Sequence, residues 1–188
     1  VEENVAFGLR MARLGSGDAP AAEDDLTRAI LLAPDHTRLF FMRSRVRQAR
    51  QDVVGARRDF EEGLQRKPAD ELSWIARGIA RLPTDPEGAL NDFDAALAIN
   101  PWSREAAQNK AHVLSERLSK PPEAIATLDP IVDRFPDYVI ARIGRGVLLA
   151  RLGRRDESRR DAAESLRRDP RGLGALARSG RAEEDESH

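Results

Sequence analysis

The feature of this sequence that most constrains its fold is a proline that returns at nearly constant spacing. Prolines stand at positions 34, 68, 101, 136 and 170, so the successive intervals are 34, 33, 35 and 34 residues. A fixed period of this length indicates a helix–turn–helix repeat, in which each unit buries its apolar face on its neighbours. We therefore predict that the chain of 188 residues folds as one continuous array of about five units.

Small side chains recur in register with these prolines. One stands twelve residues before each proline, and another occurs in the first half of each unit. The resulting pairs are Gly8 and Ala22, Ser44 and Ala56, Gly78 and Ala89, Ala111 and Ala124, and Gly146 and Ser158. Helix axes approach most closely where the side chains at the crossing are small, so each pair predicts a contact between antiparallel helices. We expect the larger residue four places further on, such as Phe60 or Phe93, to fill the space where the helices separate.

This register predicts a complete helix map. First helices are expected at about 2–14, 36–50, 70–82, 103–118 and 137–152, and second helices at about 19–33, 53–67, 86–99, 121–135 and 156–169. Differences in repeat length are expected in the loops, including one added residue near Lys120. Pro130 falls inside a second helix and removes a backbone donor there. Either the helix kinks after Thr127, or it starts early, at Pro121, and tolerates the bend.

The third unit carries the most specific motif, and its residues resemble those of the tetratricopeptide repeat family. They are Trp74, Gly78, Ala89, Phe93, Ala96 and Pro101. The resemblance covers about residues 1–170 and implies an all-α, right-handed α-solenoid with repeats at 1–34, 35–68, 69–101, 102–136 and 137–170. A partial cap is expected at 171–178, completing a single array over 1–178, with an acidic disordered tail at 179–188.

One departure from the family pattern recurs in four repeats. A basic residue precedes the first small residue where the family frequently has Leu, at positions Arg43, Arg77, Lys110 and Arg145. Long basic side chains pack their aliphatic stems while the charged head stays hydrated. We therefore expect these residues to be structural, with their heads in water.

Composition and motifs argue against several classes of function. The net charge is −1, whereas nucleic-acid binding relies on a basic footprint. The chain has no cysteine, and no run of apolar residues is long enough to span a membrane. His36, His112 and His188 lack the spacing of metal ligands on one helix face. We predict no catalytic residue, no cofactor and no metal site.

The family resemblance assigns partner binding to the concave face, which the first helices line. The residues predicted to bind a partner there are Arg38, Phe41, Arg45, Ile75, Gln108, Asn109, His112 and Ile143. Such a surface suits a peptide with apolar anchors and an acidic group. The aliphatic members have the alternative of packing in the core. The clamp of chaperone-tail receptors is not matched, because Phe41 and Ile75 stand where that clamp has its first Lys.

Three functional hypotheses follow. The first is a non-catalytic module that binds a protein or peptide in the concave groove, and the second is a structural role in which the terminal repeats mediate self-association. The third, an enzyme site, would need a bound cofactor or metal to support it. The arginine-rich repeats resemble bacterial tetratricopeptide segments of larger proteins, some of them joined to serine/threonine kinases. Because the sequence begins with Val1, we expect an upstream region, and the compartment stays open.

Overall fold

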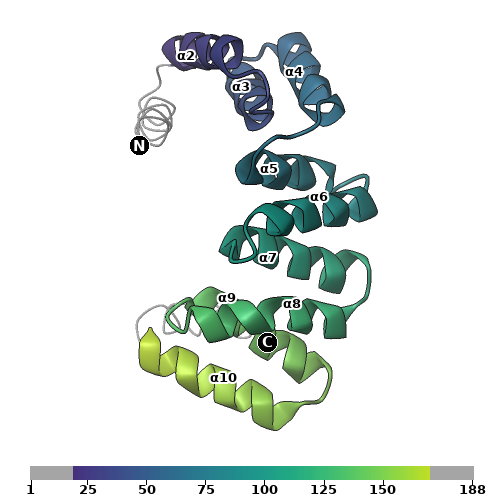
Figure 1. The fold of residues 1–188 in the computed structure, drawn as a ribbon, viewed down its shortest axis with the longest axis vertical. Helices are drawn as coiled ribbons and strands as arrows, with labels where there is room; N and C mark the ends of the chain where they lie inside the picture. The colour runs from purple at the N-terminus through teal and green to yellow at the C-terminus, as the bar shows by residue number, and fades with distance from the viewer. Residues whose placement is uncertain (1–18, 170–188) are drawn as a thin grey trace, which may run out of the picture. The chain divides into compact units, whose positions relative to one another are not determined.

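The computed structural model describes residues 19–169, which form nine α-helices and no strand (Figure 1). The helices are α2 (Ala19–Leu32), α3 (Arg38–Ala49), α4 (Val53–Gln65), α5 (Glu71–Arg81), α6 (Pro86–Ile99), α7 (Arg104–His112), α8 (Pro121–Arg134), α9 (Val139–Arg151) and α10 (Arg155–Arg168). A π-helical segment, η1 (Val113–Arg117), continues α7. The predicted helix map is confirmed to within two residues at each end. The helix expected at 2–14, the cap at 171–178 and the tail at 179–188 lie outside the described residues.

The helices fall into two compact units, which we describe separately. Unit 1 ends at Pro101 and includes α2 to α6, whereas unit 2 begins at Trp102 and includes α7 to α10. In unit 1, α3 packs on α2, α4 and α5, and α5 packs on α6. In unit 2, α8 packs on α7 and α9, and α9 packs on α10. The fold class is confirmed as an all-α helical repeat, while a single array over 1–178 stays a prediction.

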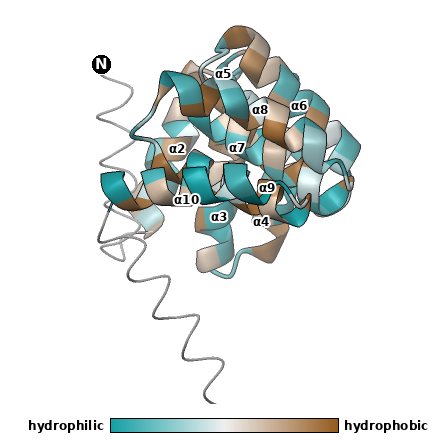
Figure 2. Ribbon diagram, turned by 90° about the horizontal axis from the view of Figure 1, so that it is seen from below, coloured by the Kyte–Doolittle hydropathy of each residue, from teal (hydrophilic) through white to brown (hydrophobic). Residues whose placement is uncertain are grey.

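Each helix carries apolar and polar residues, so one face is buried and another is exposed to solvent (Figure 2). The core contains the small residues Ala22, Ala89 and Ala124, none of which exposes any surface, together with large side chains such as Phe93. No helix within residues 19–169 has the length and apolar character needed to cross a membrane.

Acidic caps fix where several helices begin. Asp52 accepts a hydrogen bond from the Gly55 backbone N–H at 2.9 Å, and Asp85 accepts one from the N–H of Gly88 at 2.8 Å. Such a cap contributes about 0.5–2 kcal/mol. A Cβ atom at Gly55 would lie only 2.0 Å from Oδ2 of Asp52. Glycine at the third helical position therefore lets the capping carboxylate sit close to the backbone.

The predicted contacts between small residues are present in both units. Ser44 donates a hydrogen bond from Oγ to the carbonyl oxygen of Ala56 at 2.7 Å, which joins α3 to α4. At Gly146 of α9, a Cβ atom would lie 3.8 Å from the carbonyl oxygen of Ser158 in α10. The pair that includes Gly8 lies outside the described residues.

The large residue of each second helix is not always buried as expected. Phe93 is fully buried, but 38% of the Phe60 surface is exposed. The reason lies on α3, where Phe41 projects toward α4 and takes the space beside Gly63. A Cβ atom at Gly63 would lie 2.8 Å from the Phe41 ring. Phe60 then packs edge-on against Phe41 at a centroid distance of 5.7 Å and stays at the margin of the core.

The extra residue of the fourth repeat is absorbed within a helix, which corrects the loop expected near Lys120. The N–H of Leu118 donates to the carbonyl oxygen of Val113 at 3.0 Å, a hydrogen bond that spans five residues. This wider turn is the mark of a π-helical segment and accommodates one additional residue. Helix α8 starts at Pro121 and runs through Pro130 to Arg134. Its early start matches the second alternative for this helix.

Candidate functional site

We call the first helices of the repeats, α3, α5, α7 and α9, the A helices, and α2, α4, α6, α8 and α10 the B helices. In three repeats, an arginine of the A helix and an aspartate of the B helix form a couple of two parallel hydrogen bonds. The partners are Arg43 and Asp59 (2.8 and 2.7 Å), Arg77 and Asp92 (3.0 and 2.7 Å), and Arg145 and Asp161 (2.8 and 2.7 Å). Fork-to-fork pairing of guanidinium with carboxylate is strong and orients both groups.

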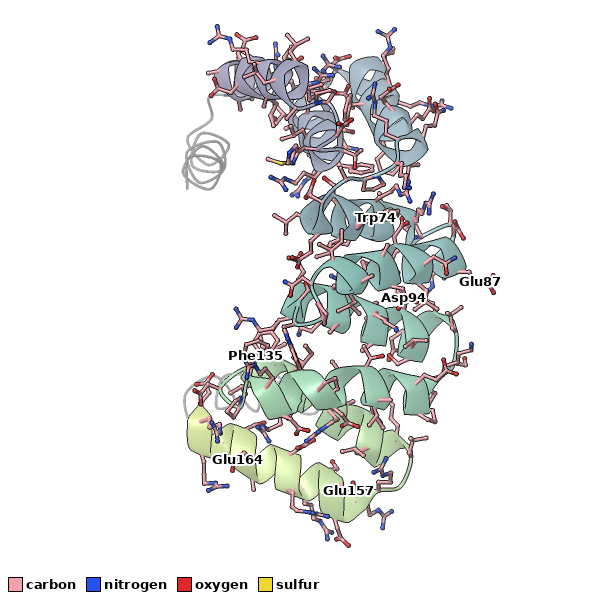
Figure 3. The ribbon with its side chains drawn as sticks, in the orientation of Figure 1. Trp74, Glu87, Asp94, Phe135, Glu157 and Glu164 are labelled. Carbon is pink, nitrogen blue, oxygen red and sulfur yellow. The ribbon has the colours of Figure 1, made fainter. Side chains whose placement is uncertain are left out.

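These couples correct the expectation that the recurring basic heads lie in water. Asp59, Asp92 and Asp161 are 2%, 1% and 4% exposed, and each guanidinium is held against its carboxylate. The head of Arg77 also stacks over the Trp74 ring, at 4.7 Å from its centroid (Figure 3 labels Trp74). The recurring arginine is therefore structural, but its role is to pair with the second helix of its own repeat.

The sequence contains a signal for these couples. The aspartate stands nine residues before the closing proline in the second, third and fifth repeats. In the fourth repeat the same two places are taken by Lys110 and Thr127. From the second to the fifth repeat, arginine and aspartate are thus present together or replaced together, whereas the first repeat has Asp25 at the aspartate position and Phe7 at the arginine position.

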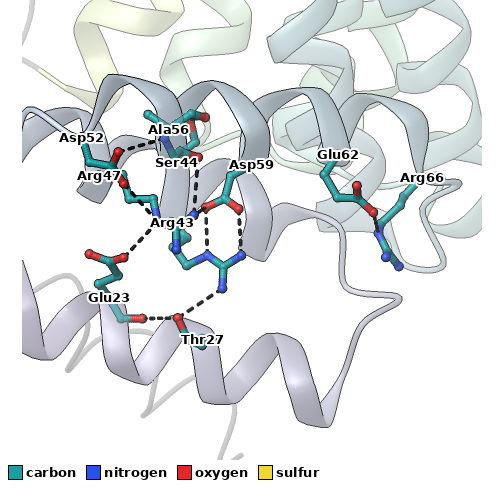
Figure 4. A network of polar contacts seen from close by, with 11 residues as sticks. Glu23, Thr27, Arg43, Ser44, Arg47, Asp52, Ala56, Asp59, Glu62 and Arg66 are labelled. Atoms are coloured by element: carbon teal, nitrogen blue, oxygen red, sulfur yellow. Dashed lines mark hydrogen bonds and ion pairs between the residues drawn. The ribbon is translucent and has the colours of Figure 1, made fainter.

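In unit 1 the couple extends into a larger polar network, which Figure 4 shows. Arg47 approaches Glu23 at 2.9 Å and Asp59 at 3.1 Å, so its guanidinium joins α2 to α4. Arg50 forms a second ion pair with Glu23. Burial raises the pKa of the Glu23 carboxyl, but hydrogen bonds and charges from Arg47 and Arg50 outweigh it and hold that pKa below its usual value.

This shift predicts how the stability of unit 1 depends on pH. Because the folded pKa of Glu23 lies below its unfolded value, the network stabilises the fold above the unfolded pKa, and this contribution is lost as pH falls through the folded pKa. Glu23→Gln is expected to lower the melting temperature more at pH 7 than at pH 3.5, where a larger fraction of the carboxyl is protonated. Thermal unfolding followed by circular dichroism at both pH values measures the difference. Glu61→Gln, at an exposed i,i+4 pair with Arg57, is the control; an equal deficit for Glu23→Gln at both pH values would contradict the prediction.

In unit 1, three of the predicted binding residues are engaged within the unit. Arg38 pairs with Asp70 at 2.9 Å, and Asp70 also caps α5, so this ion pair holds α3 to the next A helix. Phe41 and Ile75 are 9% and 2% exposed and pack in the core. Arg45 is exposed, and among residues 19–169 no carboxylate pairs with it. We therefore assign Arg38, Phe41 and Ile75 to internal contacts and keep Arg45 as a candidate.

In unit 2 the predicted residues lie on α7 and α9. Gln108 accepts a hydrogen bond from the Tyr138 hydroxyl, and the Asn109 side chain donates to the backbone carbonyl of Glu105 at 3.0 Å. His112 is exposed, and Ile143 is half-buried.

Four exposed aliphatic side chains stand at positions that the family resemblance assigns to the concave face, although they are not in the list of predicted binding residues. Leu72 and Ile79 lie on α5, and Ile140 and Val147 on α9, with exposed fractions of 44%, 44%, 61% and 48%. They stand seven residues apart on each helix, so each pair lies on one helix face. The spacing of these residues is visible in the sequence. Spacing alone does not show which aliphatic residues of a helix are exposed and which are buried.

Within residues 19–169, no cluster of three or more His, Asp or Glu side chains could hold a metal ion. The strongly buried aspartates are each paired with arginine, as described above. In each unit the A helices carry exposed apolar side chains and separate polar groups, and exposed apolar surface of this kind is suited to contact with another polypeptide.

Comparisons with known proteins agree with this geometry. Residues 116–173 match the family model described as "Tetratricopeptide repeat". The solved structure of MamA superposes with a TM-score of 0.65 at 15% identity, covering 87% of this chain and 95% of that one. The structure of TTC0263, a thermophilic TPR protein from Thermus thermophilus, gives 0.61 at 21% identity over 97% and 98%. No curated protein matches the sequence.

A third similar structure is that of YrrB, described as a TPR protein with an unusual peptide-binding site. Its TM-score is 0.64 at 16% identity, over 93% of this chain and 90% of that one. The helical repeats and the family match define an α-solenoid of the tetratricopeptide type. The family model matches residues 116–173, and proteins of the tetratricopeptide repeat family are generally non-catalytic modules that bind peptides or proteins.

Proposed function

We propose that this chain binds a peptide segment or a partner domain on its A-helix face, without catalysis. The observation that most supports this proposal is that unit 1 exposes apolar side chains on one A helix and a basic side chain on the adjacent A helix. Leu72 and Ile79 are both 44% exposed on α5. The adjacent helix α3 carries exposed Arg45, to which no described carboxylate is paired.

The physical argument rests on what each group gains from a partner. A buried aliphatic side chain contributes about 1.5–3 kcal/mol relative to an exposed one. A guanidinium gains a charge-assisted hydrogen bond from a carboxylate on the partner, which is worth more than a neutral one. A peptide with two apolar anchors and one acidic group would satisfy all three side chains together.

Unit 2 offers a second surface of related character. Ile140 and Val147 are exposed on α9, and exposed His112 stands on α7 of the same unit. The resemblance to bacterial tetratricopeptide segments favours a larger signalling protein as the host. Self-association through the terminal repeats is the competing proposal. Sedimentation over a wide concentration range tests it, because a monomer throughout would exclude it.

The binding proposal is tested with a displayed library of 12-residue peptides selected on the purified chain. Affinities of the selected peptides are then measured for the wild type and for Arg45→Ala. Since a hydrogen bond to a charged group contributes about 1.5–3 kcal/mol, we expect a loss of about tenfold or more with unchanged melting. Arg28→Ala, at an exposed arginine of the B helix α2, is the matched control. Equal affinities for wild type, Arg45→Ala and Ile79→Glu would refute the assignment of the A-helix face.

A further inference from the structure

A crevice of about 410 Å³ opens on the B-helix side of unit 1, between α2, α3 and α4. Its apolar lining consists of Ile30, Leu31, Pro34 and Phe40. Ile30 and Phe40 are almost fully buried at 9% and 5% exposure and belong to the core, so the floor of the crevice is fixed by packing. The volume falls within the range of sites that hold a small molecule or a large side chain.

The rim of the crevice is charged, and most of its charges are already paired. Arg43 is held by Asp59 at 2.7 Å, and Arg66 by Glu62 at 2.6 Å (Figure 4). Arg66 also lies over the Phe40 ring, at 4.9 Å from its centroid. The remaining rim residue, Arg58, is exposed, and within residues 19–169 it pairs with no carboxylate. The rim therefore offers one positive charge that a partner can use.

Two adjacent leucines extend the apolar surface beyond the crevice. Leu31 and Leu32, on the last turn of α2, are 77% and 87% exposed. An apolar surface that continues past a pocket is larger than a small ligand can cover, and such patches mark contacts with other polypeptides. A peptide could place one side chain in the crevice while its neighbours cover the two leucines.

The corresponding place in unit 2 is built differently. Counted back from the closing prolines, Asp133 and Arg134 stand where unit 1 has Leu31 and Leu32, and Arg142 stands in place of Phe40. The Arg142 guanidinium donates to the carbonyl oxygen of Pro136 at 3.3 Å and approaches Asp161 at 3.8 Å. The apolar floor and the exposed leucines are thus features of unit 1, and they do not follow from the repeat architecture itself.

We propose that this crevice is a second docking site, on the B-helix side, for a peptide segment with one bulky aliphatic or aromatic anchor and a carboxylate close to it. The anchor enters between Ile30, Pro34 and Phe40, and the carboxylate binds Arg58. The site shares no residue with the proposed binding surface on the A helices, so either site can be present without the other.

The test uses the 12-residue displayed peptide library, selected this time on the Arg45→Ala, Ile79→Glu double variant so that peptides for the A-helix face are removed. We expect the selected peptides to carry Leu, Ile or Phe within four residues of Asp or Glu. The dissociation constants of these peptides should rise about tenfold or more for Arg58→Glu, because the peptide carboxylate then faces a negative charge in place of the guanidinium. Leu31→Ser should weaken binding in the same direction, since it removes exposed apolar surface without touching the core.

Arg160→Glu is the matched control, because Arg160 stands at the equivalent place in the fifth repeat, ten residues before its proline. Circular dichroism must show the same melting temperature for each variant and its parent. Failure to select peptides of this composition, or selection of peptides whose affinity is unchanged by both Arg58→Glu and Leu31→Ser, would overturn the proposal. So would a concentration-dependent dimer that Leu31→Ser abolishes, because a second copy of the chain would then cover the leucines.

Discussion

Replacing Asp92 by alanine is expected to destabilise unit 1 by about 3–5 kcal/mol, because the change leaves a buried guanidinium without its counter-charge. Arg77 is 9% exposed, and both of its hydrogen bonds to a side chain end on Asp92. Its other hydrogen bond goes to the backbone carbonyl of Arg66 at 2.8 Å, which cannot neutralise the charge.

The measurement is urea unfolding followed by tryptophan fluorescence. The chain has two tryptophans, so a Trp102→Phe background leaves Trp74 of α5 as the reporter of unit 1. The double variant Arg77→Met, Asp92→Leu should recover most of the lost stability, since it removes both charges and fills the volume. If Asp92→Ala changes the unfolding free energy by less than about 1 kcal/mol, the couple does not have the proposed energetic role.

Phe93→Ala is expected to have a similar effect, about 3–5 kcal/mol, for a different reason. Phe93 is the largest side chain with no exposed surface in the described part of the chain, and its ring lies directly against Gly78 of α5. Truncation removes the ring from the contact between α5 and α6 and leaves a cavity that the two helices fill only in part.

A double-mutant cycle with Gly78 distinguishes the loss of the contact between Phe93 and Gly78 from a nonspecific loss of stability. A Cβ atom at Gly78 would lie 2.7 Å from a carbon of the Phe93 ring, so Gly78→Ala alone must displace the ring or the helix. In the Phe93→Ala background the clash is absent, and alanine is a better helix former than glycine by about 1 kcal/mol. Gly78→Ala should therefore destabilise the wild type and stabilise the Phe93→Ala variant. Additive effects would show that the two residues do not share one packing site.

The helix map could be predicted from the sequence because it depends on local signals. The period of the prolines predicted the repeat, and in the structure the capping aspartates Asp52 and Asp85 stand at two of the predicted helix starts. Helices can cross closely only where the side chains at the crossing are small. The contact between Ser44 and Ala56 could therefore be predicted, and it is present in the structure.

The burial of individual side chains was harder to predict, because it depends on partners far along the chain. Arg43 was expected in water, since its partner Asp59 stands sixteen residues away on another helix. Arg38 was expected on the binding face, but Asp70 of the next repeat holds it. Phe60 was expected in the core, and Phe41 takes that space because Gly63 leaves room for its ring.

The arginine–aspartate couples have a consequence for how a chain of similar repeats avoids misassembly. The A helix of one repeat could in principle associate with the B helix of another, because the second, third and fifth repeats carry the same charged partners. The fourth repeat interrupts this equivalence, since Lys110 and Thr127 replace the couple. An exchange that involves this repeat would bury an arginine or an aspartate without its partner. We therefore expect the fourth repeat to exchange helices with the second, third or fifth repeat less readily during folding than those three exchange among themselves.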